Sequence, residues 1–186
     1  LEYSISFDGF YDPAAGGFGR QLEDLLGAAG GILSLYEGLA DAIGDKGYLF
    51  PDGILEKRSQ PQSVADLIKL SGSLKGQGRV GFQGRLLHVL GQETITGVST
   101  SLDNGASSAN GGRGSGHITA ITGTWTLKVQ HSADNIAWAD LVTFSGKTAI
   151  GGSTNEVTGT VNRYLRATFT EDVAGSVTFV LGFARY

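Results

Sequence analysis

Residues 163–170 have the sequence RYLRATFT, and residues 177–183 have the sequence VTFVLGF. In the first stretch the apolar residues Leu165, Ala167 and Phe169 alternate with polar ones, and the second stretch is apolar at every odd position. Successive side chains of a β-strand point to opposite faces of its sheet. The alternation therefore predicts two strands that each bury one face.

The residues that come before these strands continue the same pattern. Trp125, Leu127 and Val129 alternate with polar residues, and residues 132–135 (SADN) have the composition of a turn. Short strands separated by turn signals every 8 to 12 residues or so are typical of a β-sandwich. We expect residues 116–186 to form a C-terminal β-sandwich of the jelly-roll or immunoglobulin-like type.

The first part of the chain is expected to contain strands and one or two flanking helices. The alternating residues 1–8 predict a strand, and apolar residues at helical spacing over 18–29 predict an amphipathic helix. Residues 32–43 fit a second helix, and residues 32–36 fit a short strand equally well, so this choice stays open.

Further strands are expected downstream, where the helical spacing ends. They are predicted at residues 48–50, 53–59 and 64–74. Residues 103–116 contain only Asp, Asn, Gly, Ala, Ser and Arg, which favours a flexible loop. The predicted organisation is a first domain over 1–86, a linker and flexible loop over 87–115, and the sandwich over 116–186.

Composition excludes several classes of function. The 186 residues carry a net charge of −4 with a sequence pI near 5.3, unlike the basic surface of a protein that binds nucleic-acid phosphates. Cysteine is absent, which excludes disulfides and thiolate metal sites. No apolar run approaches the roughly 18 residues of a membrane span. Methionine is also absent and the sequence starts at Leu1, so we expect a processed form or a fragment.

Two segments resemble proteins of tailed bacteriophages. The run LEYSISFDGFYD at residues 1–12, the helix around residues 22–26 and the strands up to Val80 look like the core of major tail tube proteins. The second half resembles a β-rich domain at the C-terminus of phage tail proteins, and it is also similar to galactose-binding-like jelly rolls. The segments that carry this second resemblance are 116–118, 129–135, 138–141 and 162–167.

The resemblance implies a mainly β fold in which a tail-tube-like β-sandwich or barrel, whose N-terminal part is missing here, precedes the C-terminal sandwich. It implies a structural protein of the virion, without enzymatic activity, that self-assembles into stacked six-membered rings in the host cytoplasm. Phage DNA would pass through the lumen during genome ejection without specific binding. Other tail proteins would be partners, and no membrane would be involved.

Other functions fit parts of the sequence. The C-terminal domain, displayed outside the tube, could instead be a carbohydrate- or receptor-binding module that contacts a glycan or the host surface. A capsid decoration protein is a further alternative.

The tube hypothesis gives three acidic residues a role. Glu2, Glu56 and Asp66 are candidates to face the lumen, where negative charge would keep DNA from adhering. An ordinary solvated strand face explains each of them equally well.

The two tryptophans receive different interpretations. Trp138 closely follows the predicted turn and is a candidate ligand contact, whereas Trp125 shares its stripe with Leu127 and Val129 and is expected in the core. Aromatic residues in alternating strands are more often core, which is the competing interpretation of Trp138 as well.

No motif predicts a catalytic, cofactor-binding or metal site. Residues 76–81 (GQGRVG) match the dinucleotide-binding glycine pattern, but no helix begins after them, so a turn between domains is favoured. His88, His117 and His131 lack a second metal ligand at short spacing and are expected to be structural. His131, Asp134 and a serine imitate a hydrolase triad, yet SADN fits a turn better.

Overall fold

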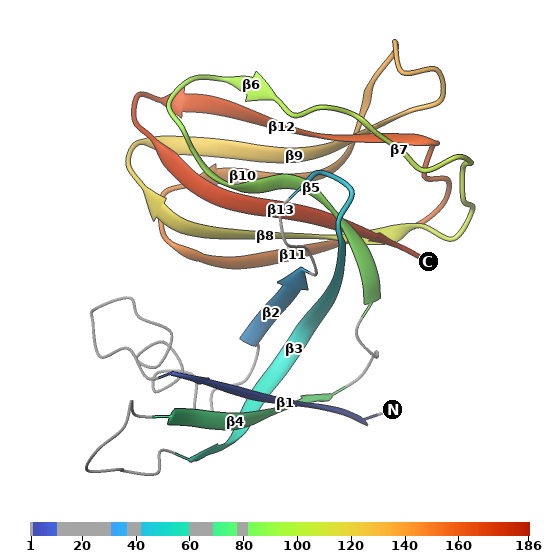
Figure 1. Ribbon diagram of the computed structural model, residues 1–186. Coiled ribbons are helices and arrows are strands. Elements are labelled where there is room, and N and C mark those ends of the chain that lie inside the picture. Colours follow the sequence, from blue (N-terminus) through green and yellow to red (C-terminus); the bar gives the residue numbers. More distant parts are fainter. Residues whose placement is uncertain (1, 11–30, 37–41, 60–68, 78–81) are drawn as a thin grey trace. The chain divides into compact units, whose positions relative to one another are not determined.

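The structure is a computed structural model that describes residues 2–10, 31–36, 42–59, 69–77 and 82–186 (Figure 1). Within these ranges the regular elements are all β-strands, which confirms the mainly β fold class. In chain order they are β1 (Glu2–Phe10), β2 (Gly31–Tyr36), β3 (Lys46–Ser59), β4 (Lys69–Gln77), β5 (Phe82–Glu93), β6 (Gly97–Val98), β7 (Leu102–Asp103), β8 (Gly112–Ile121), β9 (Thr124–Ser132), β10 (Ala139–Lys147), β11 (Gly151–Val157), β12 (Tyr164–Val173) and β13 (Val177–Arg185).

The described part of the chain contains no helix. The helix predicted over 18–29 lies outside the described residues. For residues 32–43, where helix and strand were both open, the structure has strand β2 (Gly31–Tyr36), which pairs with β3. The local spacing of apolar residues in this segment fits both a helix and a strand. Hydrogen bonding to a neighbouring strand therefore decides which of the two forms.

The chain divides into two compact units. Unit 1 comprises residues 1–33 and 50–81, and unit 2 comprises residues 34–49 and 82–186. Strand β3 contributes residues to both. Gly76 and Gln77 of the GQGRVG motif end strand β4, residues 78–81 lie outside the described residues, and the next element is strand β5.

Unit 1 contains long antiparallel strands. β1 pairs with β4 along its whole length, from Glu2 opposite Gln77 to Phe10 opposite Lys69. β4 pairs on its other side with residues 53–59 of β3. The predicted strand over 1–8 is therefore confirmed.

Unit 2 is a sandwich of two antiparallel sheets (Figure 1). The first sheet has the order β5-β13-β8-β11, with residues 46–49 of β3 paired to the outer side of β5. The second sheet has the order β10-β9-β12-β6, and β7 also pairs with β12. The two stretches at 163–170 and 177–183 thus lie in different sheets, as β12 and β13, and face each other across the core.

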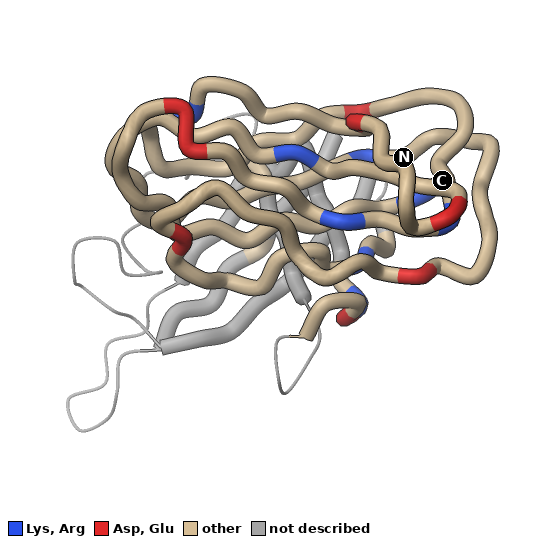
Figure 2. The backbone as a smooth tube through the Cα atoms, turned by 90° about the horizontal axis from the view of Figure 1, so that it is seen from above, with Lys and Arg blue, Asp and Glu red and all other residues tan. Residues whose placement is uncertain are grey.

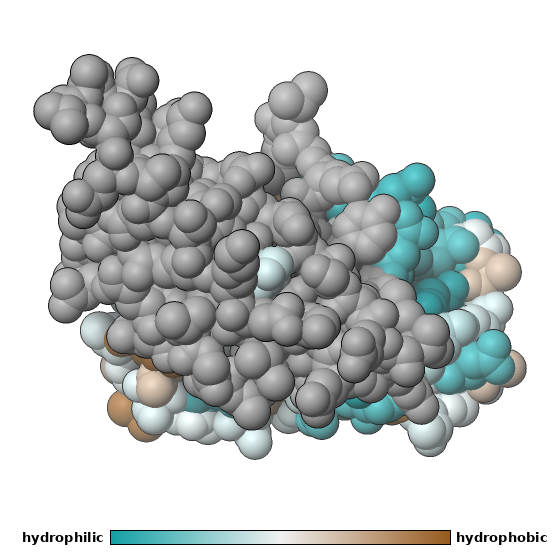
Figure 3. All heavy atoms as spheres, turned by 90° about the horizontal axis from the view of Figure 1, so that it is seen from below, coloured by the Kyte–Doolittle hydropathy of each residue, from teal (hydrophilic) through white to brown (hydrophobic). Residues whose placement is uncertain are grey.

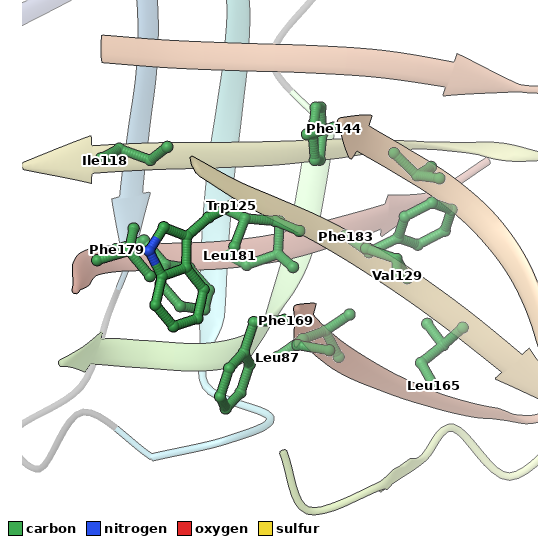
Figure 4. Close-up of a cluster of buried hydrophobic side chains, with 14 of the residues drawn as sticks. Leu87, Ile118, Trp125, Val129, Phe144, Leu165, Phe169, Phe179, Leu181 and Phe183 are labelled. Atoms are coloured by element: carbon green, nitrogen blue, oxygen red, sulfur yellow. The ribbon is translucent and has the colours of Figure 1, made fainter. Parts of the chain in front are cut away.

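The core of unit 2 is formed by the alternating residues of both sheets (Figure 4). Trp125, Leu127 and Val129 of β9 are completely or almost completely buried, as are Phe179 and Leu181 of β13. The predicted core position of Trp125 is therefore confirmed. The other buried apolar members of this core are Leu87, Ile118, Val142, Phe144, Val161, Leu165, Ala167, Phe169, Val177 and Phe183.

The predicted linker over 87–115 is wrong. Strand β5 runs through its start, where Leu87 is fully buried, and β8 begins at Gly112. The sandwich therefore starts near Phe82 rather than at residue 116. Composition was misleading here because the small residues of β8 are needed for close packing: a Cβ added at Gly112 would collide with the Phe183 ring and the Ala184 carbonyl.

The remaining part of the predicted flexible loop is bound to the sandwich by hydrogen bonds. Ser108 and Val161 exchange two backbone hydrogen bonds of 2.9 Å. The Arg185 guanidinium donates to the carbonyl oxygens of Ala106, Val161 and Asn162 at 2.6 to 2.7 Å. This loop is therefore part of unit 2 and is not a linker between two domains.

The surface of unit 2 carries charges of both signs without a block of one sign (Figure 2). Where the described residues are visible from below, hydrophilic and intermediate residues are mixed with scattered hydrophobic ones (Figure 3). The described residues contain no helix long and apolar enough to cross a membrane.

Candidate binding face on the second sheet

The outer face of the second sheet is polar because its strands alternate. In β9 the residues between the buried Trp125, Leu127 and Val129 are half-buried and polar. The pairing register places Gln130 directly opposite Arg166 of β12 on one side and Asp140 of β10 on the other. Three polar side chains from three strands therefore stand in one row.

The residues of this row are joined by direct hydrogen bonds. The Gln130 side-chain oxygen accepts from Nε and Nη2 of Arg166 at 2.9 and 2.8 Å. The Gln130 amide donates to one Asp140 oxygen at 2.7 Å, and the Lys128 ammonium donates to the other at 2.7 Å. The hydrogen bonds from Gln130, and after them those from Lys128, lower the pKa of Asp140, which is therefore ionised at neutral pH.

Trp138 extends the row at the start of β10. The Arg166 guanidinium lies 4.1 Å from the centre of the Trp138 ring, within the range of a cation–π interaction. The indole is half-buried. Burial lowers the pKa of Arg166, although an arginine in a protein keeps its charge. We call these five residues, Lys128, Gln130, Trp138, Asp140 and Arg166, the Trp138 face.

The turn before Trp138 fixes its position. One Asp134 oxygen accepts hydrogen bonds from the backbone N–H groups of Ile136 and Ala137 and from the Ser132 hydroxyl, each at 2.9 Å. These bonds lower the pKa of Asp134. Asn135 has a left-handed backbone with φ of 63°, a conformation that asparagine tolerates. The predicted turn at 132–135 is therefore confirmed.

The same hydrogen bonds are not those of a hydrolase triad formed by Ser132, His131 and Asp134. The Ser132 hydroxyl binds Asp134, while His131 Nδ1 accepts a hydrogen bond from the backbone N–H of Asn162 at 3.2 Å. Burial and the charge of Arg185 lower the pKa of His131. No proton path from serine to histidine to aspartate follows from these contacts.

The other histidines also lie in structural surroundings. His88 is buried and stacks on Phe179, with ring centres 4.0 Å apart, and its Nε2 lies 3.2 Å from a Glu93 oxygen. Burial lowers the pKa of His117. In the part of the chain that the structure describes, no three side chains of His, Asp or Glu gather at a metal-binding distance.

The three candidate lumen residues stay predictions. Glu2 lies on β1 and Glu56 on β3, in unit 1, while Asp66 lies outside the described residues. Trp138 is the one sequence-predicted site residue whose side chain is described. Its four companions were missed, because a polar residue on the outer face of a strand has no signal that separates it from a solvated one.

Chemically, the Trp138 face offers an aromatic ring beside a line of charged and amide groups. Aromatic stacking combined with polar groups that fix orientation is the general composition of small-molecule binding sites. The polar groups already bind one another, and one side of the indole carries the Arg166 guanidinium. A ligand would therefore have to use the remaining ring surface and the exposed rims of Lys128 and Asp140.

No family model and no curated protein matches this chain. Among solved structures, the chain is similar to the SPP1 Dit protein, described as a paradigm of the hub adsorption apparatus in phages that infect Gram-positive bacteria. The match covers 100% of this chain and 78% of that one, at 12% identity and a TM-score of 0.26, and the likeness is weak.

Proposed function

We propose that this chain is a non-enzymatic structural subunit of a phage tail, which assembles with copies of itself and with other tail proteins. The observation that carries the proposal is the edge strand β1. It is nine residues long and pairs, among the described strands, with β4 alone. An edge strand presents unpaired backbone donors and acceptors, to which a strand of a neighbouring chain can be added.

The sequence supports the phage assignment, because residues 1–86 resemble major tail tube proteins. In detail, we propose rings of six subunits that stack into a tube in the virion, after assembly in the host cytoplasm. Unit 2 would be displayed outside, and DNA would pass during genome ejection without specific binding. The net charge of −4 favours a passive conduit, since few phosphates could be neutralised.

Electron microscopy of the purified protein tests this proposal. We expect rings with six-fold symmetry and hollow tubes, and a large particle by light scattering. A protein that stays monomeric at every concentration, or that appears as knobs on a capsid, would contradict the tail-tube proposal.

Two proline variants test the role of β1. Adjacent residues of a strand direct their N–H groups to opposite sides, so one of Ile5→Pro and Ser6→Pro removes a bond to β4 and the other an outward donor. We expect the variant that keeps the thermal stability of the wild type to lose assembly. If that variant still forms tubes, β1 is not the contact between subunits.

A second function is favoured by the Trp138 face. The arrangement of Trp138 beside Arg166 suits a module that binds a glycan or another host-surface ligand. Glycan-array binding of the wild type that is lost in Trp138→Ala would support it. Equal binding by both proteins, or none by either, would count against it.

A further inference from the structure

A hollow of about 280 Å³ lies at the end of the sandwich where the chain passes from β10 to β11. It is lined by residues 145–153 and by Ile118 of β8. This volume is just below the range of roughly 300 to 1,000 Å³ that is usual for small-molecule sites. It is therefore suited to one sugar-sized group rather than to a longer chain.

The shape of the hollow is set by two glycines. Gly146 has φ of 60° and Gly151 has φ of 137°, values that residues with a side chain rarely adopt. A Cβ at either position would meet nothing within 4 Å, so conformation rather than packing requires glycine there. Between the two glycines the backbone turns from one sheet to the other and leaves the hollow open.

The hollow contains a positive charge. Lys147 is half-buried, and its ammonium donates a hydrogen bond to the Ser153 hydroxyl at 2.8 Å. Among the described residues no carboxylate forms an ion pair with Lys147, in contrast to Lys128, which binds Asp140. An ammonium has three donors, so two remain for a ligand.

We propose that this hollow binds a small anionic group, a carboxylate or a phosphate, carried by a molecule of the size of a sugar. Lys147 supplies the counter-charge, and the hydroxyls of Ser145, Thr148 and Ser153 supply hydrogen bonds. Of the two isoleucines in the lining, Ile118 is almost completely buried and Ile150 is 65% exposed, so the apolar side of the ligand has surfaces to contact. This site is separate from the Trp138 face and does not depend on the proposed tail function.

A titration of the full chain followed by amide NMR tests the proposal. The probes are orthophosphate, glucuronate and glucose in buffer of low ionic strength, because salt screens such contacts. We expect saturable shifts that centre on residues 145–153 with at least one of the two anions and none with glucose. Shifts with phosphate alone identify a phosphorylated ligand, and shifts with glucuronate alone identify an acidic sugar.

Two lysine variants form the matched pair. Lys147→Gln removes the charge and should weaken anion binding about tenfold or more, whereas Lys46→Gln, at an exposed position of β3 that does not line the hollow, should bind as the wild type does. Lys147→Arg keeps the positive charge and should keep anion binding. It tests the proposal in case Lys147→Gln fails to fold. Equal shifts with glucose, unchanged binding in Lys147→Gln, or shifts that centre elsewhere would overturn the proposal.

Discussion

At the scale of single residues, Asp103 and Arg163 form a bidentate ion pair between β7 and the start of β12. Nε and Nη2 of Arg163 each lie 2.6 Å from an Asp103 oxygen, and the Gly105 N–H donates to the same carboxylate. The hydrogen bonds from Arg163, and then that from Gly105, lower the pKa of Asp103 to about 2. The pair is solvent-exposed, which limits its contribution to stability.

This pKa predicts a dependence on pH. The pKa of the folded state lies below the unfolded value of about 3.9, so the contribution is complete above pH 4 or so and is lost as the pH falls towards about 2. We expect Asp103→Asn to lower the melting temperature by at most a few degrees at pH 7 and by nothing near pH 2. Calorimetry at several pH values measures this. A difference in melting temperature that persists at pH 2 would assign the effect to packing. The control is Asp172→Asn, which removes another exposed carboxylate, on β12, one that accepts a hydrogen bond from the Thr126 hydroxyl.

The two tryptophans provide a second prediction. Trp125 is fully buried and donates from its indole nitrogen to the Thr122 carbonyl at 3.1 Å, whereas Trp138 is half-buried on the outer face. Trp125→Ala should reduce the free energy of unfolding by about 3 to 5 kcal/mol. Trp138→Ala should cost less than about 1 kcal/mol. Urea unfolding followed by circular dichroism compares them, and equal losses would contradict the assignment of core and face.

At the scale of elements, the β8–β9 turn and the β12–β13 turn pack backbone against backbone. A Cβ added at Gly175 would collide with the Thr122 carbonyl and lie 2.7 Å from the nitrogen of Gly123. We expect Gly175→Ala to destabilise unit 2 by about 1 to 3 kcal/mol.

Gly91→Ala is the matched control for this turn contact, because the nearest atom would be at an ordinary 3.7 Å. It should be neutral or stabilising by up to about 1 kcal/mol. The melting temperatures of both variants, compared with that of the wild type, test this expectation. A Gly175→Ala protein as stable as the wild type would show that the two turns can separate without cost.

At the scale of the whole molecule, unit 2 should fold without unit 1. Its buried apolar cluster is formed by residues between Leu87 and Phe183, and residues 46–49 add only one short paired segment at the outer side of β5. We expect a fragment of residues 82–186 to unfold cooperatively with dispersed NMR signals. A fragment of residues 116–186 should not, because it lacks β5 and the start of β8. Cooperative folding of the shorter fragment would support the domain boundary at residue 116 that the sequence predicts.

The sequence by itself determined the strands whose side chains alternate. The alternation in 163–170 and 177–183 predicted β12 and β13, and Trp125 was assigned to the core, because period two and burial of one face follow from strand geometry alone. It also predicted the turn at 132–135, since Asp and Asn side chains bond to the nearby backbone whatever surrounds them. The role of Trp138 as a ligand contact remains a prediction.

Only the tertiary structure decided where unit 2 begins, that residues 31–36 form a strand, and which polar residues accompany Trp138. The sequence predicts a linker over 87–115 because glycine and serine are more common in loops than in strands, and local composition cannot show a partner strand. The row of Arg166, Gln130 and Asp140 and the hollow around Lys147 depend on pairing register and on a crossing between sheets. Such contacts join residues far apart in the chain, so no local pattern encodes them.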